Sequence, residues 1–270
     1  MTASIVAGLG AAPARRSFLL GREARLRVLY VASPLTVLAL WQLASVAGYL
    51  DERYFPAPTA ILAALGEMTT DGTLAANLGP TMSRVLIGLA LGVVPGVILG
   101  PIVGYSATAR AIVQPLVDLT FPIPKLAVFP LFLIIFGLGD TAIHAVIAVS
   151  IFYLVLINCA DGVQNLSTTY REVAEDSGAS RWMLLFNVAL PGALPPTLSG
   201  IRLAANIALL VTVATEFVGS SSGLGYLVWN SWQLFQVTTM YAGLVILAVI
   251  GFVMSVILRG IERLLVPWNR

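Results

Sequence analysis

Three ionisable side chains, Asp118, Lys125 and Glu216, stand in segments that are otherwise almost free of charge. A charged group at the centre of a membrane costs roughly 3 kcal/mol, so each of the three is a candidate for a functional role. Such a group can line a transport path, and an acid can couple transport to a proton or a sodium ion. These three residues are therefore the candidate substrate pathway.

Each candidate also has a structural explanation. Asp118 and Lys125 are seven residues apart, or two helical turns, so they can share one face of a helix and form a structural pair if the intervening prolines do not turn them away. A position nearer the membrane surface is a further alternative for both. Glu216 precedes the turn-rich sequence GSSSGLG, which places it near the outer end of its helix. There it either lines the path or serves packing or capping.

Residues for catalysis or metal binding are not gathered anywhere in the sequence. His144 is the only histidine and Cys159 the only cysteine. We find neither a glycine–serine nucleophile elbow nor a Walker loop for a nucleotide. We therefore expect no catalytic residue, no metal ligand and no cofactor bound by this chain, which cannot hydrolyse ATP alone.

The composition indicates a membrane protein. Hydrophobic residues make up 58% of the chain, charged residues 10%, and the mean hydropathy is +0.92. A soluble domain carries about 25% charged residues. The net charge of +2 is too small to suggest a nucleic-acid partner.

The few charges divide the chain into apolar spans of the length that crosses a bilayer. Three spans free of Asp, Glu, Lys and Arg lie within residues 28–50, 85–109 and 141–160. Three more are expected within residues 111–139, 203–219 and 241–258. The sequence thus predicts an all-α polytopic membrane protein with six transmembrane helices, in which a five-helix core is joined by one N-terminal helix.

Prolines and glycines mark two of these spans. Pro115, Pro122, Pro124 and Pro130 lie in one segment, where they predict a broken helix beside a transport path or, equally, a kinked packing helix. In the preceding span a glycine recurs every four residues, which predicts a narrow face for the close approach of another helix. These glycines are Gly88, Gly92, Gly96 and Gly100.

The basic residues give the orientation, because short cytoplasmic loops retain Lys and Arg. If the N-terminus is cytoplasmic, most other arginines are cytoplasmic too, while the outer segments are mainly acidic. Both termini and the polar segment 172–191 are then on the cytoplasmic side. The arginines placed inside are Arg15, Arg16, Arg22, Arg25, Arg27, Arg110, Arg171, Arg181, Arg202, Arg259, Arg263 and Arg270.

Segment 172–191, EVAEDSGASRWMLLFNVALP, predicts two short helices joined by a glycine elbow. Gly178 supplies a left-handed stop, and Ser180 can cap the second helix, which Pro191 is expected to end. On the first helix an uncharged side that contains Tyr170 and Val173 is expected to pack, which leaves the charged side for a partner. On the second helix an apolar stripe is formed by Trp182, Leu185, Phe186 and Ala189.

This segment resembles the cytoplasmic loop in permease subunits of ABC importers. The matching positions are Glu172, Ala174, Gly178, Val188, Leu190 and Pro191, with Val173 in place of the usual first alanine. Residues 122–140, PIPKLAVFPLFLIIFGLGD, and residues 199–228 are similar to the nitrate, sulfonate and taurine branch of binding-protein-dependent permeases. The resemblance leads us to expect a neutral residue in many relatives at the position of Lys125. The resemblance covers most of residues 80–265.

The resemblance implies a transmembrane permease subunit of an ATP-driven importer that works by alternating access. The solute would be a small anion such as a sulfonate, taurine, nitrate or an aromatic carboxylate, delivered by an external substrate-binding protein. Two cytoplasmic ATP-binding subunits would carry ATP and Mg, and a second copy of the permease would complete a homodimer in the lipid of the bacterial inner membrane. Contact with the ATPase is implied for Glu172, Ala174, Glu175, Gly178, Ala179 and Pro191.

The expected organisation follows from the spans and the resemblance together. A basic cytoplasmic tail (1–27) precedes the N-terminal transmembrane helix (28–48) and an external amphipathic connection (49–80). The permease core (81–265) contains the cytoplasmic coupling loop (163–200), and residues 266–270 form a cytoplasmic tail. An ion-coupled secondary transporter that uses Asp118 or Glu216 is the alternative function. A membrane enzyme would need a catalytic constellation that we do not find.

Overall fold

The computed structural model describes residues 14–166 and 168–268, in which every regular element is a helix. This confirms the predicted all-α class. Residues 1–13 of the predicted N-terminal tail, Ser167 and the last two residues, 269–270, lie outside the described part. The chain divides into two compact units, residues 1–62 and 63–270, each described by itself below.

The first unit contains the helix α1, Ala14–Val46, and the turns that follow it. Residues Val28–Val46 are apolar enough to cross a membrane. After α1 the chain turns at Gly48, whose φ is +77°. The side chain of Gln42 donates to the hydroxyl of Thr59 and accepts from its backbone N–H, which ties the end of α1 to the start of the helix α2, Pro58–Thr70.

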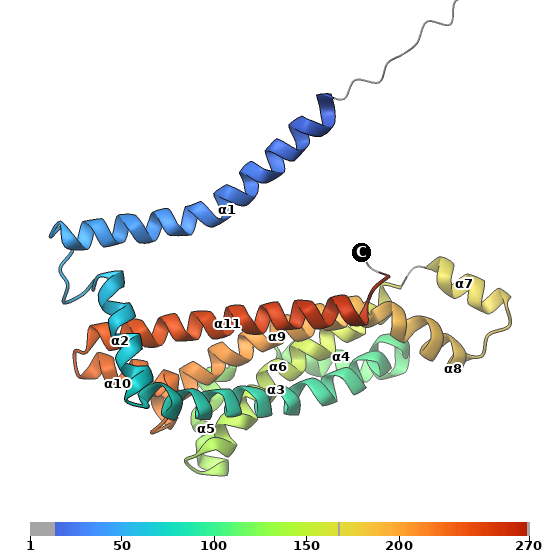
Figure 1. Cartoon of the computed structure of the whole chain (residues 1–270). Coiled ribbons are helices and arrows are strands. Elements are labelled where there is room, and N and C mark those ends of the chain that lie inside the picture. The colour runs from blue at the N-terminus through green and yellow to red at the C-terminus, as the bar shows by residue number, and fades with distance from the viewer. Residues whose placement is uncertain (1–13, 167, 269–270) are drawn as a thin grey trace, which may run out of the picture. The chain divides into compact units, whose positions relative to one another are not determined.

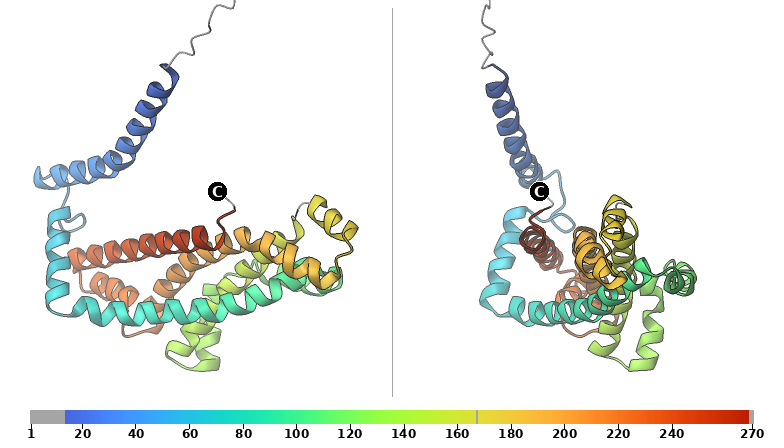
Figure 2. Two further views of the ribbon diagram at one scale, coloured as in Figure 1. Left: turned by 45° about the vertical axis from the view of Figure 1, so that its right-hand side comes forward. Right: turned by 90° about the vertical axis from the view of Figure 1, so that its right-hand side faces the viewer.

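The second unit is built around the helix α6, Asp140–Gln164, which packs mainly against α3, Thr73–Tyr105, and α9, Leu190–Gly219. The helices α10, Leu224–Gln233, and α11, Val237–Leu265, pack against α9 and each other. Figures 1 and 2 show α7 (Thr168–Asp176) and α8 (Arg181–Leu184) at one end of these long helices and α10 at the opposite end. The completely buried side chains of α6 include Ile143, Val146, Ile147, Ile151 and Val155.

Glycines on α3 allow α6 to approach closely. Gly88, Gly92, Gly96 and Gly100 are all buried and face Ile147, Ile151, Val155 and Cys159 in turn. A Cβ atom on Gly92 would lie 2.6 Å from the carbonyl oxygen of Ala148 and would overlap Ile151. The predicted close helix contact is therefore confirmed.

The described part contains five helices that are long and apolar enough to span a membrane, and a bent helix pair makes a sixth. The pair consists of α4, Ala107–Thr120, and the helical residues Lys125–Phe136, which meet at 80°. Residues Lys125–Val128 form the 3-10 turn η1, and Phe129–Phe136 form α5. The prolines thus break this span as predicted, and six spans result when the pair is counted as one.

Pro191 does not end a helix, contrary to the prediction. The segment η2, Leu185–Ala189, is a π-helix that joins α8 to α9, so Trp182–Gly219 runs on as one helix. The backbone N–H of Leu190 reaches back five residues to the carbonyl of Leu185. Pro191 directly follows this π turn, in which the hydrogen-bond register has shifted, and the helix continues through it as α9.

We predict that Gly92→Val destabilises the second unit, because the new side chain meets the backbone of α6. Overpacking of this kind costs about 1–3 kcal/mol. Gly79→Val is the matched control on the same helix, since nothing lies within 4 Å of a Cβ atom at Gly79. Thermal unfolding of the purified chain in detergent should show a lower midpoint for Gly92→Val alone, and equal midpoints for the two variants would contradict the packing described.

Candidate functional site

The coupling segment, residues 168–191, begins with α7 and ends its first helix at a glycine elbow. Gly178 has a φ of +72°, a left-handed conformation that glycine adopts without strain. The N–H of Ala179 donates to the carbonyl of Ala174 at 2.9 Å, which is the six-to-one bond of a Schellman motif. Two of the residues predicted to contact an ATPase, Ala174 and Ala179, thus fix the elbow through their backbones.

Both sides of α7 are open within this chain. Glu172 and Asp176 are exposed, as predicted for the charged side, and Glu175 lies on the same helix. Tyr170 and Val173 are 64% and 60% exposed, so the expectation that this side packs is wrong for the isolated chain. The helix has few neighbours of its own to cover it. It is therefore available to another molecule on more than one face.

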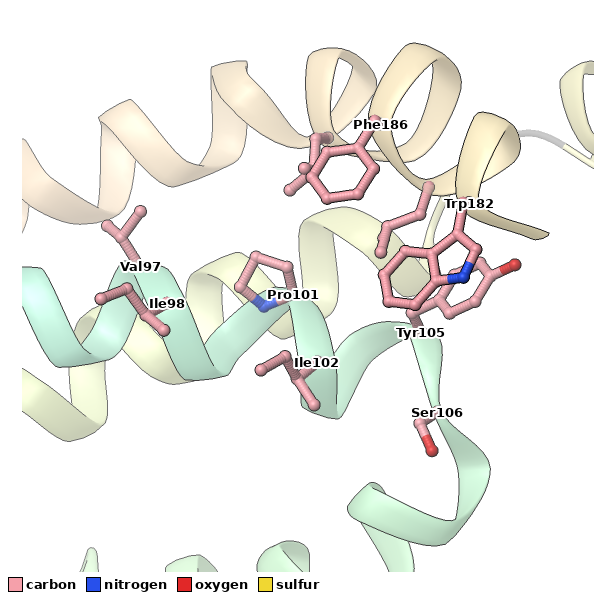
Figure 3. A pocket seen from close by; sticks show the side chains of 10 residues that line it. Val97, Ile98, Pro101, Ile102, Tyr105, Ser106, Trp182 and Phe186 are labelled. Carbon is pink, nitrogen blue, oxygen red and sulfur yellow. The ribbon is translucent and has the colours of Figure 1, made fainter. Parts of the chain in front are cut away.

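The second helix of the coupling segment borders an apolar groove. Ser180 caps α8 by accepting the N–H of Met183 at 3.2 Å, as predicted. The rings of Trp182 and Phe186 are stacked with their centroids 6.0 Å apart and face the end of α3 across the groove (Figure 3). The cavity measures about 670 Å³ and is also lined by Val97, Ile98, Pro101, Ile102, Tyr105, Ser106, Leu185 and Leu190.

The broken span brings Lys125 to the end of α4 but does not pair it with Asp118. The ammonium nitrogen of Lys125 donates to the carbonyls of Thr120, Phe121 and Ile123. Asp118 is exposed and accepts from the side chain of Gln114 at 2.9 Å. The structural pair suggested by their spacing is therefore absent from the described contacts.

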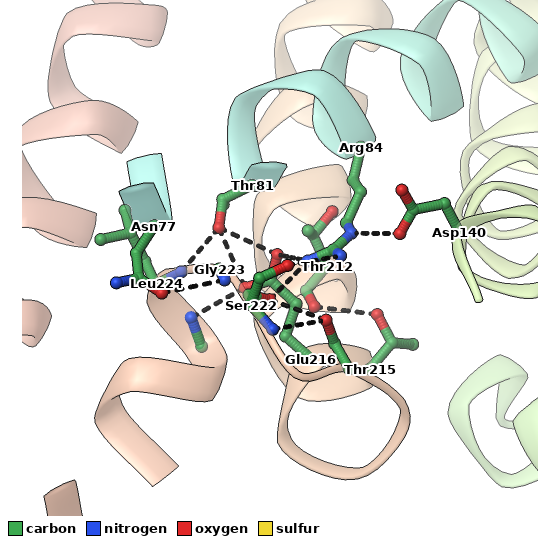
Figure 4. A network of polar contacts seen from close by, with 12 residues as sticks. Asn77, Thr81, Arg84, Asp140, Thr212, Thr215, Glu216, Ser222, Gly223 and Leu224 are labelled. Carbon is green, nitrogen blue, oxygen red and sulfur yellow. Dashed lines mark hydrogen bonds and ion pairs between the residues drawn. The ribbon is translucent and has the colours of Figure 1, made fainter. Parts of the chain in front are cut away.

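Glu216 lies in a buried polar cluster near the C-terminal end of α9, with no part of the residue exposed. Nη1 of Arg84 donates to Oε1 of Glu216 at 2.7 Å, and the hydroxyl of Thr81 donates to the same carboxylate at 2.9 Å (Figure 4). The N–H of Gly225 donates to Oε2 at 2.8 Å. This placement favours packing over a path, two roles that the sequence left open.

Arg84 joins three parts of the fold. Its Nε donates to Asp140 at the start of α6 at 2.8 Å, and its Nη1 also donates to the carbonyl of Ser222 at 2.7 Å. A polar cavity of about 410 Å³ opens beside the arginine and is lined in part by Asp140 and Ser220. The guanidinium thus connects α3, α6 and the loop after α9.

Arg84 was not predicted as a site residue. The apolar span was expected to begin at residue 85, so Arg84 was placed just outside it. The helix in fact starts at Thr73, so Arg84 lies well inside it with a side chain only 5% exposed. The sequence did contain one indication that Arg84 has a role inside the helix. Arg84 is a charged residue three positions after Thr81 in an otherwise apolar segment. The glycines of the sequence GLG, residues 223–225, were a second indication of close packing at this place. A Cβ atom on Gly225 would lie 2.9 Å from Oε2 of Glu216.

We predict that Glu216→Leu is strongly destabilising, because it leaves the guanidinium of Arg84 buried without its main partner. Breaking a buried pair in this way costs about 3–5 kcal/mol. The double variant Arg84→Met with Glu216→Leu should recover most of the loss, since it removes both charges. Asp140→Asn is the control, because Asp140 is 58% exposed and an exposed pair is worth about 0–1 kcal/mol. Thermal unfolding in detergent measures all three, and a single variant no worse than the control would contradict the burial of the pair.

Comparison with known proteins identifies the family. Residues 92–270 match the family described as binding-protein-dependent transport system inner membrane component. The chain is 31% identical to the taurine transport system permease protein TauC of Escherichia coli (strain K12), over 93% of this chain and 92% of TauC. It is 32% identical to SsuC of Bacillus subtilis (strain 168), provisionally described as an aliphatic sulfonates transport permease protein, over 87% of this chain and 86% of SsuC.

A solved structure has the same fold. The inward-facing MetNI methionine ABC transporter contains a chain that covers 68% of this chain and 92% of its own length, with a TM-score of 0.61 and 20% identity. That match agrees with the packed helices described above. The family match over residues 92–270 and the relatives above 30% identity show that this chain belongs to the inner membrane components of binding-protein-dependent transport systems.

Proposed function

We propose that this chain is the permease of an ATP-driven importer for small sulfonates, of the kind represented by taurine and aliphatic sulfonates. The observation that carries the proposal is the near full-length match to a taurine permease. A cationic side chain in the broken span, Lys125, is in keeping with an anionic group on the solute. An external binding protein delivers the solute to the permease.

The proposed partners are two cytoplasmic ATP-binding subunits and a second copy of this chain. ATP and Mg are bound by those subunits, and this chain binds no cofactor. The coupling segment is the docking surface, with Glu172, Ala174, Glu175, Gly178, Ala179 and Pro191 as its contact residues. The exposure of both sides of α7 supports this assignment. In this arrangement both termini and the coupling segment are cytoplasmic.

The mechanism we infer is mechanical coupling along one helix. Closure of the ATPase pair displaces α7 and α8, and the π segment transmits the displacement because it continues directly into α9. At the far end of α9, the pair of Glu216 with Arg84 links the helix to α3, so the membrane helices tilt together. Alternating access then follows from the tilt of packed helices, without any chemistry in this chain.

Uptake of taurine by cells that express the chain with its ATP-binding and binding-protein partners tests the proposal. Glu172→Lys should lower uptake about tenfold or more and should release the ATP-binding subunit during purification, because a contact charge is reversed. Glu67→Lys is the matched control, since Glu67 is an exposed carboxylate on α2. Absence of sulfonate uptake by the wild type would refute the proposed function, and normal uptake by Glu172→Lys would refute the coupling role.

Gly178→Val tests the elbow separately. No atom lies within 4 Å of a Cβ atom at Gly178, so any effect comes from the backbone conformation and not from a clash. A β-branched residue is strained at a φ of +72°, whereas asparagine tolerates it. We expect Gly178→Val to lose uptake several-fold and Gly178→Asn to retain it. Equal uptake by both variants would mean that the left-handed elbow is not needed.

A further inference from the structure

The break between α4 and η1 leaves backbone carbonyls without their usual donors. Pro122 and Pro124 have no N–H, so the carbonyls of Asp118 and Thr120, four residues earlier, cannot form helical hydrogen bonds with them. Away from water such carbonyls must find other donors within the protein. The end of α4 also carries the partial negative charge of a helix C-terminus.

The ammonium group of Lys125 donates to three carbonyls at the break, and one of them, that of Thr120, lost its usual donor to Pro124. The ammonium nitrogen donates to the carbonyl of Phe121 at 3.1 Å and to that of Ile123 at 3.0 Å, and it donates to the carbonyl of Thr120 as well. An ammonium group has three protons, so three carbonyls use all of them. The nitrogen also lies 4.8 Å from the ring centroid of Tyr153 and 5.9 Å from that of Phe121, within the range of cation–π attraction.

The positive charge of Lys125 is not neutralised by these contacts. Carbonyls and aromatic rings are dipoles and quadrupoles without net charge, and they stabilise a cation while leaving its charge in place. The ion pairs in residues 14–166 and 168–268 join Arg53 to Asp51, Arg84 to Asp140 and Glu216, and Arg202 to Glu262. The break therefore carries a fixed positive charge on a half-buried side chain.

We propose that Lys125 is the residue that selects anionic solutes in this permease. Its hydrogen bonds keep the span broken, and its charge attracts a sulfonate as the solute passes the break. This inference rests on the proposed function for the identity of the solute. The position of the positive charge at the break does not depend on the proposed function.

Two sulfonates of nearly equal size distinguish the effect of the solute's net charge on uptake from the effect of its shape. Isethionate, 2-hydroxyethanesulfonate, is an anion, whereas taurine, 2-aminoethanesulfonate, has no net charge. For Lys125→Met, which removes the charge at similar length, we expect isethionate uptake to fall about tenfold more than taurine uptake, because a monopole interaction is lost only for the anion. Lys125→Arg should preserve the ratio of the two uptake rates. An equal loss of both solutes would reduce Lys125 to a structural role, and no loss would refute the proposal.

A second experiment measures the local charge without any substrate. Leu126 is 45% exposed, and Cys159 is the only cysteine, so Leu126→Cys in a Cys159→Ala background provides a single thiol beside the lysine. The complex is treated with methanethiosulfonate reagents that carry either a sulfonate or a trimethylammonium group. Adding Lys125→Met should lower the ratio of anionic to cationic reaction rates about tenfold, because the thiol loses a neighbouring cation.

The two experiments fail in different ways. An unchanged ratio of thiol reaction rates, or a thiol that reacts with neither reagent, would show that Lys125 places no charge on a water-accessible path. Absence of uptake of both sulfonates by the wild type would refute the proposed function while the thiol ratio still reports the charge. Failure of the selectivity inference is thereby distinguished from failure of the proposed function.

Discussion

The absence of water in a bilayer governs this structure, because every backbone group and every charge inside it must be satisfied by the protein. The broken span and the polar cluster around Glu216 meet this constraint in different ways. At the break, the ammonium group of Lys125 donates to three backbone carbonyls at and just after the end of α4. In the cluster, a carboxylate, a guanidinium and two hydroxyl-bearing side chains satisfy one another across α3 and α9.

Close helix packing is what makes these polar contacts possible. The glycines of α3 bring its backbone against α6, and that proximity sets where Arg84 and Asp140 meet. Gly223 and Gly225, at the N-terminal end of α10, have the same effect on Glu216, since any side chain at either position would overlap its carboxylate. Small residues thus determine where charges can be buried, although they carry no chemistry themselves.

The sequence was sufficient for features that depend on local pattern. The class, the spans, the glycine face, the break at the prolines and the elbow at Gly178 all follow from periodicity or from the conformational limits of a single residue type. Contacts between segments that are distant in the sequence could not be predicted from it. The partner of Glu216 lies 132 positions away, and no local pattern links it to Arg84.

Two expectations for segments that contain proline were also not met, each for a physical reason. Pro191 was expected to end a helix, but a π-helical turn before it shifts the hydrogen-bond register, so the helix continues. The spacing of Asp118 and Lys125 assumed an intact helix, and the 80° break removes the common face. Both cases concern prolines. Whether a proline ends a helix depends on whether neighbouring N–H groups can form hydrogen bonds with other carbonyls.

The continuous helix Trp182–Gly219 has 38 residues and therefore a length of about 57 Å at the usual rise per residue. The apolar interior of a bilayer is only about 30 Å thick. Even when tilted, such a rod extends well beyond the lipid at one end or both. A single continuous helix thus runs from the apolar interior of the bilayer into its aqueous surroundings, and its C-terminal end lies beside the buried charges near Glu216.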